Sequence, residues 1–303
     1  MAISSQSRLS MFAFTICIMS TSIAEDLPDR YKENPEIGYF GRMSKVLFDA
    51  NVTDTTIATD MIIRNVFGLM DMRSNIVVYD KKNKLIEDLS KNRLDAVFIN
   101  SIDFLDMQHL VDMDHLYSLI YGKSTEQSIF LLVRNSDNIN AINELRDKSL
   151  SIPKGHFLGR KFLEVVLMEN SLPITESFFS SVIETPDTNT AIVDLYFSKT
   201  DAALVSDIAF ELAAELNPQI SKSLSPIVKS EKLVPQIIAI NKNVPDSILK
   251  KVDAFLIKSH ENKRIKHLLS MFRAKKFVKL NQTHINTNQR LINRHSQLLM
   301  VNQ

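Results

Sequence analysis

Polar and basic side chains follow four predicted strands, in each case where a helix is expected to begin. They are Thr53, Thr55, Thr56, Asn100 and Ser101 in the first half of the chain, and Lys154, His156, Arg160, Ser206 and Asp207 in the second. The free N–H groups at a helix start attract negative charge, and a nearby cation adds charge-assisted hydrogen bonds. The pattern therefore predicts a binding site for a small anion or zwitterion. The alternative is that the threonines only cap their own helix and that Lys154 and Arg160 lie on an exposed helix face.

Catalytic motifs are absent from the sequence. There is no nucleophile elbow (G-x-S-x-G), no phosphate loop (G-x-x-x-x-G-K-[ST]) and no metalloprotease helix (H-E-x-x-H). His109 and His115 are six positions apart and would not face one ion from a single helix turn, so we interpret them as surface histidines. We expect a binding protein without catalytic residues, metal or cofactor. An exported hydrolase is the rival class, because a fold can bring a nucleophile and a base together from distant positions.

Two stretches of nineteen residues, 86–104 and 192–210, share one layout and are identical at seven positions. Each reads as the end of a helix, a basic turn, an Asp-Ala step, a short apolar strand and a polar pair. Helix, strand and helix in that order make half of a parallel α/β unit, and ligands bind outside the carboxyl ends of the strands in open α/β sheets. Two such units predict two lobes that face one cleft. The alternative is a chance likeness between two strands of a single domain.

Apolar periodicity predicts strands that alternate with helices along the chain. Strands are expected at 43–54, 76–79, 94–99, 115–120, 127–134, 150–152 and 235–240, and helices at 55–70, 82–92, 102–113, 155–169, 207–216 and 247–272. The last helix is expected to be long, continuous and amphipathic. This alternation is typical of an α/β protein.

Residues 1–24 are predicted to be a secretory signal peptide. Arg8 supplies the positive start, Met11–Met19 the apolar segment, and the small residues before Ala24 the cleavage site. The apolar segment is shorter than the ~20 residues of a membrane span, which disfavours the alternative of an uncleaved anchor. The only cysteine, Cys17, lies inside the signal, so the mature chain is expected to lack disulfides and thiolate sites. Export without disulfides favours a bacterial periplasm.

The charge balance of the mature chain gives no sign of nucleic-acid binding. Cleavage would leave equal numbers of basic and acidic residues, 35 of each, and the basic excess is confined to the C-terminus. Nine Lys or Arg follow Glu261 with no acidic residue after it, and residues 281–303 are interpreted as a polar, basic tail. This region is either a solvated helix face and tail or a docking surface for an anionic membrane or an acidic partner.

We expect the protein to be a monomer.

Several motifs, taken in their order along the chain, carry a family resemblance. They are LDAVF at 94–98, SIFLLVRNSDNI at 128–139, LRDKSLSI at 145–152 and TDAALV at 200–205. The order resembles that of the periplasmic phosphate- and phosphonate-binding proteins of ABC importers, a branch of the type II solute-binding proteins. The resemblance covers roughly residues 43–272.

The resemblance implies two α/β lobes, each a mixed sheet flanked by helices, joined by two crossing segments near 122–128 and 234–240 and closing on a ligand. Lobe 1 would comprise residues 25–128 plus 241–280, and lobe 2 residues 129–240. The ligand would be phosphonate-like, phosphate-like or a carboxylate. The implied partner is the permease of an importer, or alternatively a membrane-bound sensor kinase or cyclase.

One stretch departs from the family pattern. The family holds the phosphonate with a serine-rich turn after the strand that corresponds to 150–152, whereas this chain has PKGHFLGR at 153–160, with no serine. Lys154 and His156 would replace neutral donors by basic ones, which suits a carboxylate as well as a phosphonate.

Overall fold

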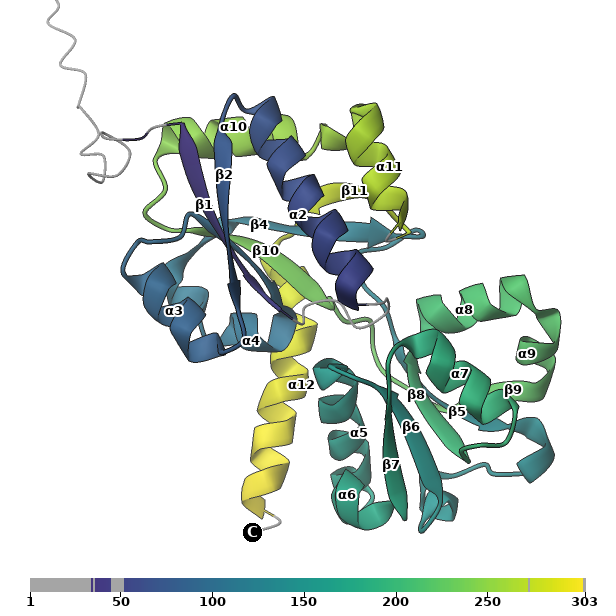
Figure 1. Ribbon diagram of the computed structural model, residues 1–303. Helices are drawn as coiled ribbons and strands as arrows, with labels where there is room; N and C mark the ends of the chain where they lie inside the picture. Colours follow the sequence, from purple (N-terminus) through teal and green to yellow (C-terminus); the bar gives the residue numbers. More distant parts are fainter. Residues whose placement is uncertain (1–33, 35, 45–51, 272, 302–303) are drawn as a thin grey trace, which may run out of the picture.

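The chain folds into two α/β lobes, each built on its own mixed sheet (Figure 1). The computed structural model describes residues 34, 36–44, 52–271 and 273–301. For residues 52–55 it describes the backbone alone. The expected signal peptide therefore lies outside the described residues. Among the described residues, every helix is too short or too polar to cross a lipid bilayer.

Lobe 1, as we use the term, is the six-stranded sheet and the helices on it. Its strand order is β11-β4-β10-β3-β1-β2, in which β1, β2 and β3 run parallel and β10 pairs antiparallel with β3 and β4. The strands are β1 (Ile37–Met43), β2 (Arg73–Tyr79), β3 (Ala96–Asn100), β4 (Val111–Tyr121), β10 (Gln236–Asn241) and β11 (Ala274–Lys279).

The lobe 1 sheet has an apolar core on each face. Helices α2 (Val52–Leu69), α10 (Asp246–Leu256) and α11 (Lys263–Met271) bury their apolar side chains on one face, and α3 (Lys82–Ser90) and α4 (Ser101–Leu105) bury theirs on the other. Two 3-10 turns, η1 (Gln108–Leu110) and η4 (Ser259–Glu261), complete the lobe.

Lobe 2 is the five-stranded sheet, in the order β7-β6-β8-β5-β9, with the helices that flank it. The strands are β5 (Ile129–Arg134), β6 (Ser149–Pro153), β7 (Ser181–Thr185), β8 (Ala202–Ser206) and β9 (Leu224–Lys229). The helices are α5 (Phe157–Glu169), α6 (Thr175–Phe178), α7 (Thr188–Tyr196), α8 (Asp207–Leu216) and α9 (Pro218–Ser223), with 3-10 turns η2 (Asn135–Asp137) and η3 (Ile142–Leu145). The predicted α/β class is confirmed.

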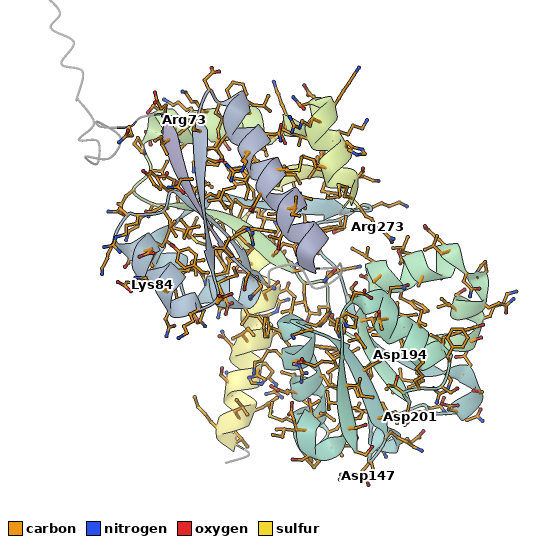
Figure 2. The ribbon with its side chains drawn as sticks, in the orientation of Figure 1. Arg73, Lys84, Asp147, Asp194, Asp201 and Arg273 are labelled. Atoms are coloured by element: carbon orange, nitrogen blue, oxygen red, sulfur yellow. The ribbon has the colours of Figure 1, made fainter. Side chains whose placement is uncertain are left out.

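The repeated stretch occurs once in each lobe, as α3-β3-α4 and as α7-β8-α8. The turn before each strand contains a residue of positive φ, Asn92 at 55° and Ser198 at 60°. The Asp of each Asp-Ala step accepts a hydrogen bond from a neighbouring strand: Tyr39 N donates to Asp95 Oδ2 at 2.6 Å, and Ser149 N to Asp201 Oδ2 at 2.9 Å. Asp201 lies at the end of lobe 2 that points away from lobe 1 (Figure 2). The same residue types thus build the same local structure twice.

The first strand was expected at 43–54, but it lies at Ile37–Met43, and a helix has already begun at Val52. Two glycines hide this strand in the sequence. A Cβ atom on Gly38 would lie 2.0 Å from the Phe67 ring, and one on Gly41 would lie 2.7 Å from Leu94. The glycines are there because neighbouring side chains pack directly on the strand backbone.

Three other expectations about the C-terminal third need correction. The single helix expected at 247–272 is interrupted by η4 and forms two helices, α10 and α11. Strand β10, which the boundary at residue 240 assigned to lobe 2, pairs with β3 and β4 and so belongs to the lobe 1 sheet. In place of the tail expected at 281–303 there is a helix of 20 residues, α12 (Gln282–Val301).

Helix α12 joins the two lobes along one side of the molecule (Figure 1). Ile285, near its start, is buried in the core that contains α3 and α4, whereas Leu291 packs against the lobe 2 core beside α5. Between them, Asn288 is buried and bonds to Val234, in the segment that leads from β9 to β10, and to Ser101 at the start of α4. The polar composition of α12 conceals these few buried contacts, which is why the sequence suggested a tail.

Candidate ligand-binding site at the junction of the lobes

The carboxyl ends of one strand from each lobe meet the two segments that connect the lobes. These segments are residues 122–128, between β4 and β5, and 230–235, between β9 and β10. Ser101 N, just after β3, donates to Pro235 O at 3.1 Å, and Asp207 N, just after β8, donates to Ser128 O at 2.9 Å. The segments also pair with each other through Gln127 and Leu233. The strand ends that carry four of the ten predicted site residues therefore lie at the junction of the lobes.

The lobe 1 candidates fall into a helix start and a strand end. Thr53, Thr55 and Thr56 all lie in the first turns of α2, inside the helix rather than at its cap. The side chains of Thr53 and Thr55 lie outside the described part, and Thr56 is partly exposed. Asn100 caps α4 by accepting from Asp103 N at 2.9 Å, and Ser101 is buried and accepts from Asn288 Nδ2 at 2.7 Å. Both of these last side chains are thus engaged in holding the fold.

The lobe 2 candidates after β6 differ widely in exposure and charge. Lys154 is exposed and makes no ion pair within the described part of the chain. Arg160 bonds to Glu176 at 3.2 Å and to Glu184 at 3.1 Å, so its charge is balanced by two carboxylates. Only Lys154 therefore remains as an uncommitted cation in this segment.

His156 is fully buried at the start of α5. Burial lowers the pKa of its imidazole to about 4, so the ring is neutral near pH 7. A Cβ atom on Gly159 would lie only 1.8 Å from His156 Nδ1, which shows that the ring packs directly on the glycine one turn later. His156 therefore does not supply the positive charge that the sequence suggested.

Ser206 and Asp207 are both buried at the start of α8. Ser206 Oγ accepts from Ala209 N at 3.2 Å and caps the helix. Asp207 forms an ion pair with Lys232, which lies on the second connecting segment. This pair ties lobe 2 to the connection, so neither residue is free to meet a ligand in this arrangement.

Arg42 is a charged residue at the junction that the sequence analysis missed. It occupies the next-to-last position of β1, pairs in register with Phe98 of β3, and is 3% exposed. Its Nε donates to Asp60 Oδ1 of α2 at 2.7 Å, and within the described part of the chain its Nη1 and Nη2 atoms make no hydrogen bond. A lone arginine between glycine and methionine resembles a surface position, and only the position of the α2 helix above it reveals its burial.

Four further polar side chains are buried or half-buried at the junction. Ser118 Oγ donates to Gln236 O at 2.9 Å, and the Gln236 side chain donates to the Tyr121 hydroxyl. Gln127 is 3% exposed, and its Nε2 has no hydrogen-bond partner in the described part of the chain. Unsatisfied buried donors are costly, so they are rare without a functional reason.

The N-terminus of α5 is the other electrostatic feature of the junction. Within the described part of the chain, its N-cap residue His156 makes no side-chain capping bond, in contrast to Ser206, which caps α8. Its first turn carries the positive end of a 13-residue helix and lies close along the chain to the exposed Lys154. A helix start with a neighbouring cation can hold an anionic group, and Arg42 offers two further donors from lobe 1.

Among the described residues of lobe 1, neither a metal site nor an enclosed anion site is evident away from the junction. The described residues contain no group of three His, Cys, Asp or Glu that could hold a metal ion. A cavity of about 70 Å³ lies between α2, α10 and the sheet, but its lining is apolar apart from Asp95. Such a cavity does not suit an anion, because it offers no donor to replace water.

Comparison with known proteins adds a family match. A family model described as the periplasmic substrate-binding protein of a phosphonate ABC transporter matches residues 63–285. None of the curated protein sequences matches the chain.

Solved structures with a similar fold come from several bacteria. A binding-protein component of an ABC phosphonate transporter from Pseudomonas aeruginosa is 12% identical, with a TM-score of 0.63 over 88% of this chain and 89% of that one. PhnD1 from Prochlorococcus marinus, in complex with methylphosphonate, is 14% identical, with a TM-score of 0.62 over 86% and 100%. A Xanthomonas citri protein bound to ATP is 12% identical, with a TM-score of 0.63 over 87% and 98%. At these identities the likeness establishes a shared fold.

Proposed function

The chain belongs to the periplasmic substrate-binding proteins of phosphonate ABC transporters, and we propose that it captures a small anion or zwitterion between its lobes for an importer. The proposed ligand class is a phosphonate, a phosphate-like anion or a small carboxylate. The two-lobed type II fold supports binding by closure of the lobes about the connecting segments. The class includes carboxylates because the turn after β6 has Lys154 and no serine, and a basic side chain suits a carboxylate as well as a phosphonate.

The observation that carries this proposal is Arg42. Within the described part of the chain, the buried Arg42 guanidinium has one ion pair and two nitrogens without a hydrogen bond, whereas buried charges are normally fully paired. Its planar fork suits two oxygen atoms of one phosphonate or carboxylate group. We propose that the ligand completes the hydrogen bonds of Arg42 when the lobes close.

From lobe 2, we propose that the N-terminus of α5 and Lys154 hold the opposite side of the anion. The first turns of α2, with Thr53, Thr55 and Thr56, would contribute donors from lobe 1. We propose a structural role for four other residues, because their hydrogen bonds and ion pair fix the helix starts and the connecting segments. These residues are Asn100, Ser101, Ser206 and Asp207. His156 would shape the turn as a neutral ring.

We also propose that residues 1–24 are removed on export, near Ala24, and that the mature protein carries out no catalysis. The delivery partner would be the permease of an ABC importer. The signal-like N-terminus and the lack of catalytic motifs in the sequence support these points.

Isothermal titration calorimetry tests the proposed ligand class. Methylphosphonate, phosphate, acetate and a neutral amide of similar size would be titrated into the wild type and into Arg42→Lys, Lys154→Ala and Lys148→Ala. Lys148 is an exposed lysine that directly precedes β6, at the opposite end of this strand from Lys154, and it serves as the control. We expect one anion to bind the wild type and the control alike, and to bind both site variants more weakly. Binding of the neutral amide alone, or equal affinity in all four proteins, would refute the proposal.

A further inference from the structure

The C-terminal part of lobe 1 carries a concentrated positive charge. Residues 262–279 contain seven Lys or Arg and no Asp or Glu, although the whole chain is nearly neutral. All seven side chains are exposed, and only Lys279 forms an ion pair in the described part of the chain, with Asp253. The other six are Lys263, Arg264, Lys266, Arg273, Lys275 and Lys276, which we call the cationic border.

The cationic border lies on exposed positions of α11 and β11 and at Arg273 between them. Helix α11 buries Ile265, Leu268 and Leu269 against the sheet and α2, which leaves the three cations near its start facing solvent. The edge strand β11 follows directly and turns its lysines outward between buried Ala274 and Phe277. Figure 2 shows Arg273 projecting outward where α11 meets β11, on the side where α8 of lobe 2 lies.

Protection of a sheet edge accounts for only part of this charge. Exposed lysines on an edge strand prevent pairing with other strands, and a bulge between Ala274 and Phe277 has the same effect. That role explains Lys275 and Lys276. It does not explain why α11, which is not a sheet edge, carries three more cations without one acidic neighbour in the helix.

The residue types point to one kind of partner. Lysine is depleted in protein–protein interfaces and arginine is enriched there, whereas four of the six border residues are lysines. Flexible ammonium groups suit a fluid array of lipid phosphates, which does not demand the fixed fork of arginine. Met271, 54% exposed, lies at the end of α11 among these cations and supplies an apolar side chain for the headgroup region.

We infer that the cationic border docks lobe 1 on the surface of an anionic phospholipid membrane. Docking through lobe 1 would hold the binding protein close to the membrane while lobe 2 remains free to move. This inference concerns a surface separate from the proposed ligand site, and it does not depend on which anion that site binds.

Vesicle co-sedimentation tests the inference with protein recovered from the periplasm of an expressing bacterium. The vesicles would contain phosphatidylcholine alone or equal parts phosphatidylcholine and phosphatidylglycerol, at low salt and at about 0.5 M NaCl. We expect binding only to the anionic vesicles at low salt. The variant Lys263→Glu/Lys266→Glu/Lys276→Glu should weaken that binding about tenfold or more, and the same three changes to Gln should weaken it less. These side chains are exposed and unpaired in the described structure, so the fold should be retained.

The control is Lys148→Glu/Lys222→Glu, which changes exposed lysines of lobe 2. It should bind anionic vesicles like the wild type. Circular dichroism and the anion titration described above should give the same result for wild type and triple variant, which separates loss of docking from loss of the fold or of ligand binding. Absence of wild-type binding, equal loss in the control, or binding only to a reconstituted permease in neutral vesicles would overturn the inference.

Discussion

Arg42 Nε donates a hydrogen bond to Asp60 Oδ1 at 2.7 Å and so joins the end of β1 to helix α2. The arginine side chain is 4% exposed and the aspartate side chain 28%, which leaves the guanidinium buried and its partner at the border of solvent. Buried charges persist in proteins when they are paired or when a ligand completes their hydrogen bonds. The pair therefore fixes the position of Arg42 and neutralises its charge, and the proposed ligand would bind Nη1 and Nη2.

We expect Arg42→Lys to weaken anion binding by about 10- to 100-fold, which corresponds to loss of charge-assisted hydrogen bonds worth about 1.5–3 kcal/mol. The charge remains, but the planar fork that can meet two oxygens is lost. Calorimetric titration with the anion that binds the wild type measures the effect. The matched control is Arg73→Lys, because Arg73 forms an exposed pair with Glu36 on the same sheet. Equal affinity of Arg42→Lys and wild type would show that Arg42 is only a structural residue.

The sequence predicted the parts of the fold in which local pattern and final structure agree. The helix-turn-strand-cap unit at 86–104 and 192–210 was recognisable because its turn and its helix cap are both local. Strand β1 was misplaced because Gly38 and Gly41 interrupt its apolar pattern. Glycine is needed at these positions because the side chains of Phe67 and Leu94, which are distant in sequence, pack on the strand backbone. Contacts of that kind leave no periodic signal.

Gly38→Ala should destabilise lobe 1 by about 1–3 kcal/mol, the usual cost of overpacking, because its Cβ atom would lie 2.0 Å from the Phe67 ring. Phe67→Leu should relieve part of that cost in the double variant. Chemical denaturation of the three variants gives the coupling between the two sites.

Gly68→Ala is the matched control for that experiment. A Cβ atom there meets nothing within 4 Å, and the residue lies in helix α2, so alanine should stabilise the protein by up to about 1 kcal/mol. Additive effects of Gly38→Ala and Phe67→Leu would contradict the proposed close packing.

The candidate site shows a different limit of sequence reasoning. The order of strands and helices was enough to predict that polar residues after the strands lie at the junction. It was not enough to predict the hydrogen-bond and ion-pair partners of their side chains. The Asn100 and Ser206 side chains cap helices, and the Asp207 carboxylate pairs with Lys232 from a connecting segment 25 positions later. Because such partners are set by tertiary structure, the sequence could identify the position of a side chain and not its bonding.

Asn288 provides a test of the contribution of α12. It accepts from Val234 N at 3.0 Å and donates to Val234 O at 2.8 Å and to Ser101 Oγ at 2.7 Å. Asn288→Leu would leave these buried groups without partners and should reduce the free energy of unfolding by about 2–4 kcal/mol. Urea denaturation measures the change. Asn286→Leu, on the exposed face of the same helix, should change it by less than about 0.5 kcal/mol. A similar small effect at both positions would show that α12 does not hold the connecting segment.

His156 predicts a pH dependence of stability. Burial lowers the pKa of its imidazole from 6.5 to about 4 in the folded protein. Between these two values the unfolded chain binds more protons than the folded one, so stability falls as the pH is lowered from 6.5 to about 4 and this contribution then levels off. The full effect of one such group is on the order of 3 kcal/mol.

Replacement of His156 by Phe removes the titrating group and keeps a planar ring against Gly159. The carboxylates that also titrate in this range are common to both proteins, so the difference between wild type and His156→Phe isolates the histidine. We expect the variant to lose less stability than the wild type between pH 6.5 and about 4, measured by urea denaturation at each pH. His156→Gln should show the same flatter profile at lower overall stability, because it keeps no ring to pack on Gly159. Parallel pH profiles for wild type and both variants would mean that the pKa of His156 is the same in the folded and unfolded chains, and the lowered pKa assigned to this buried ring would then be wrong.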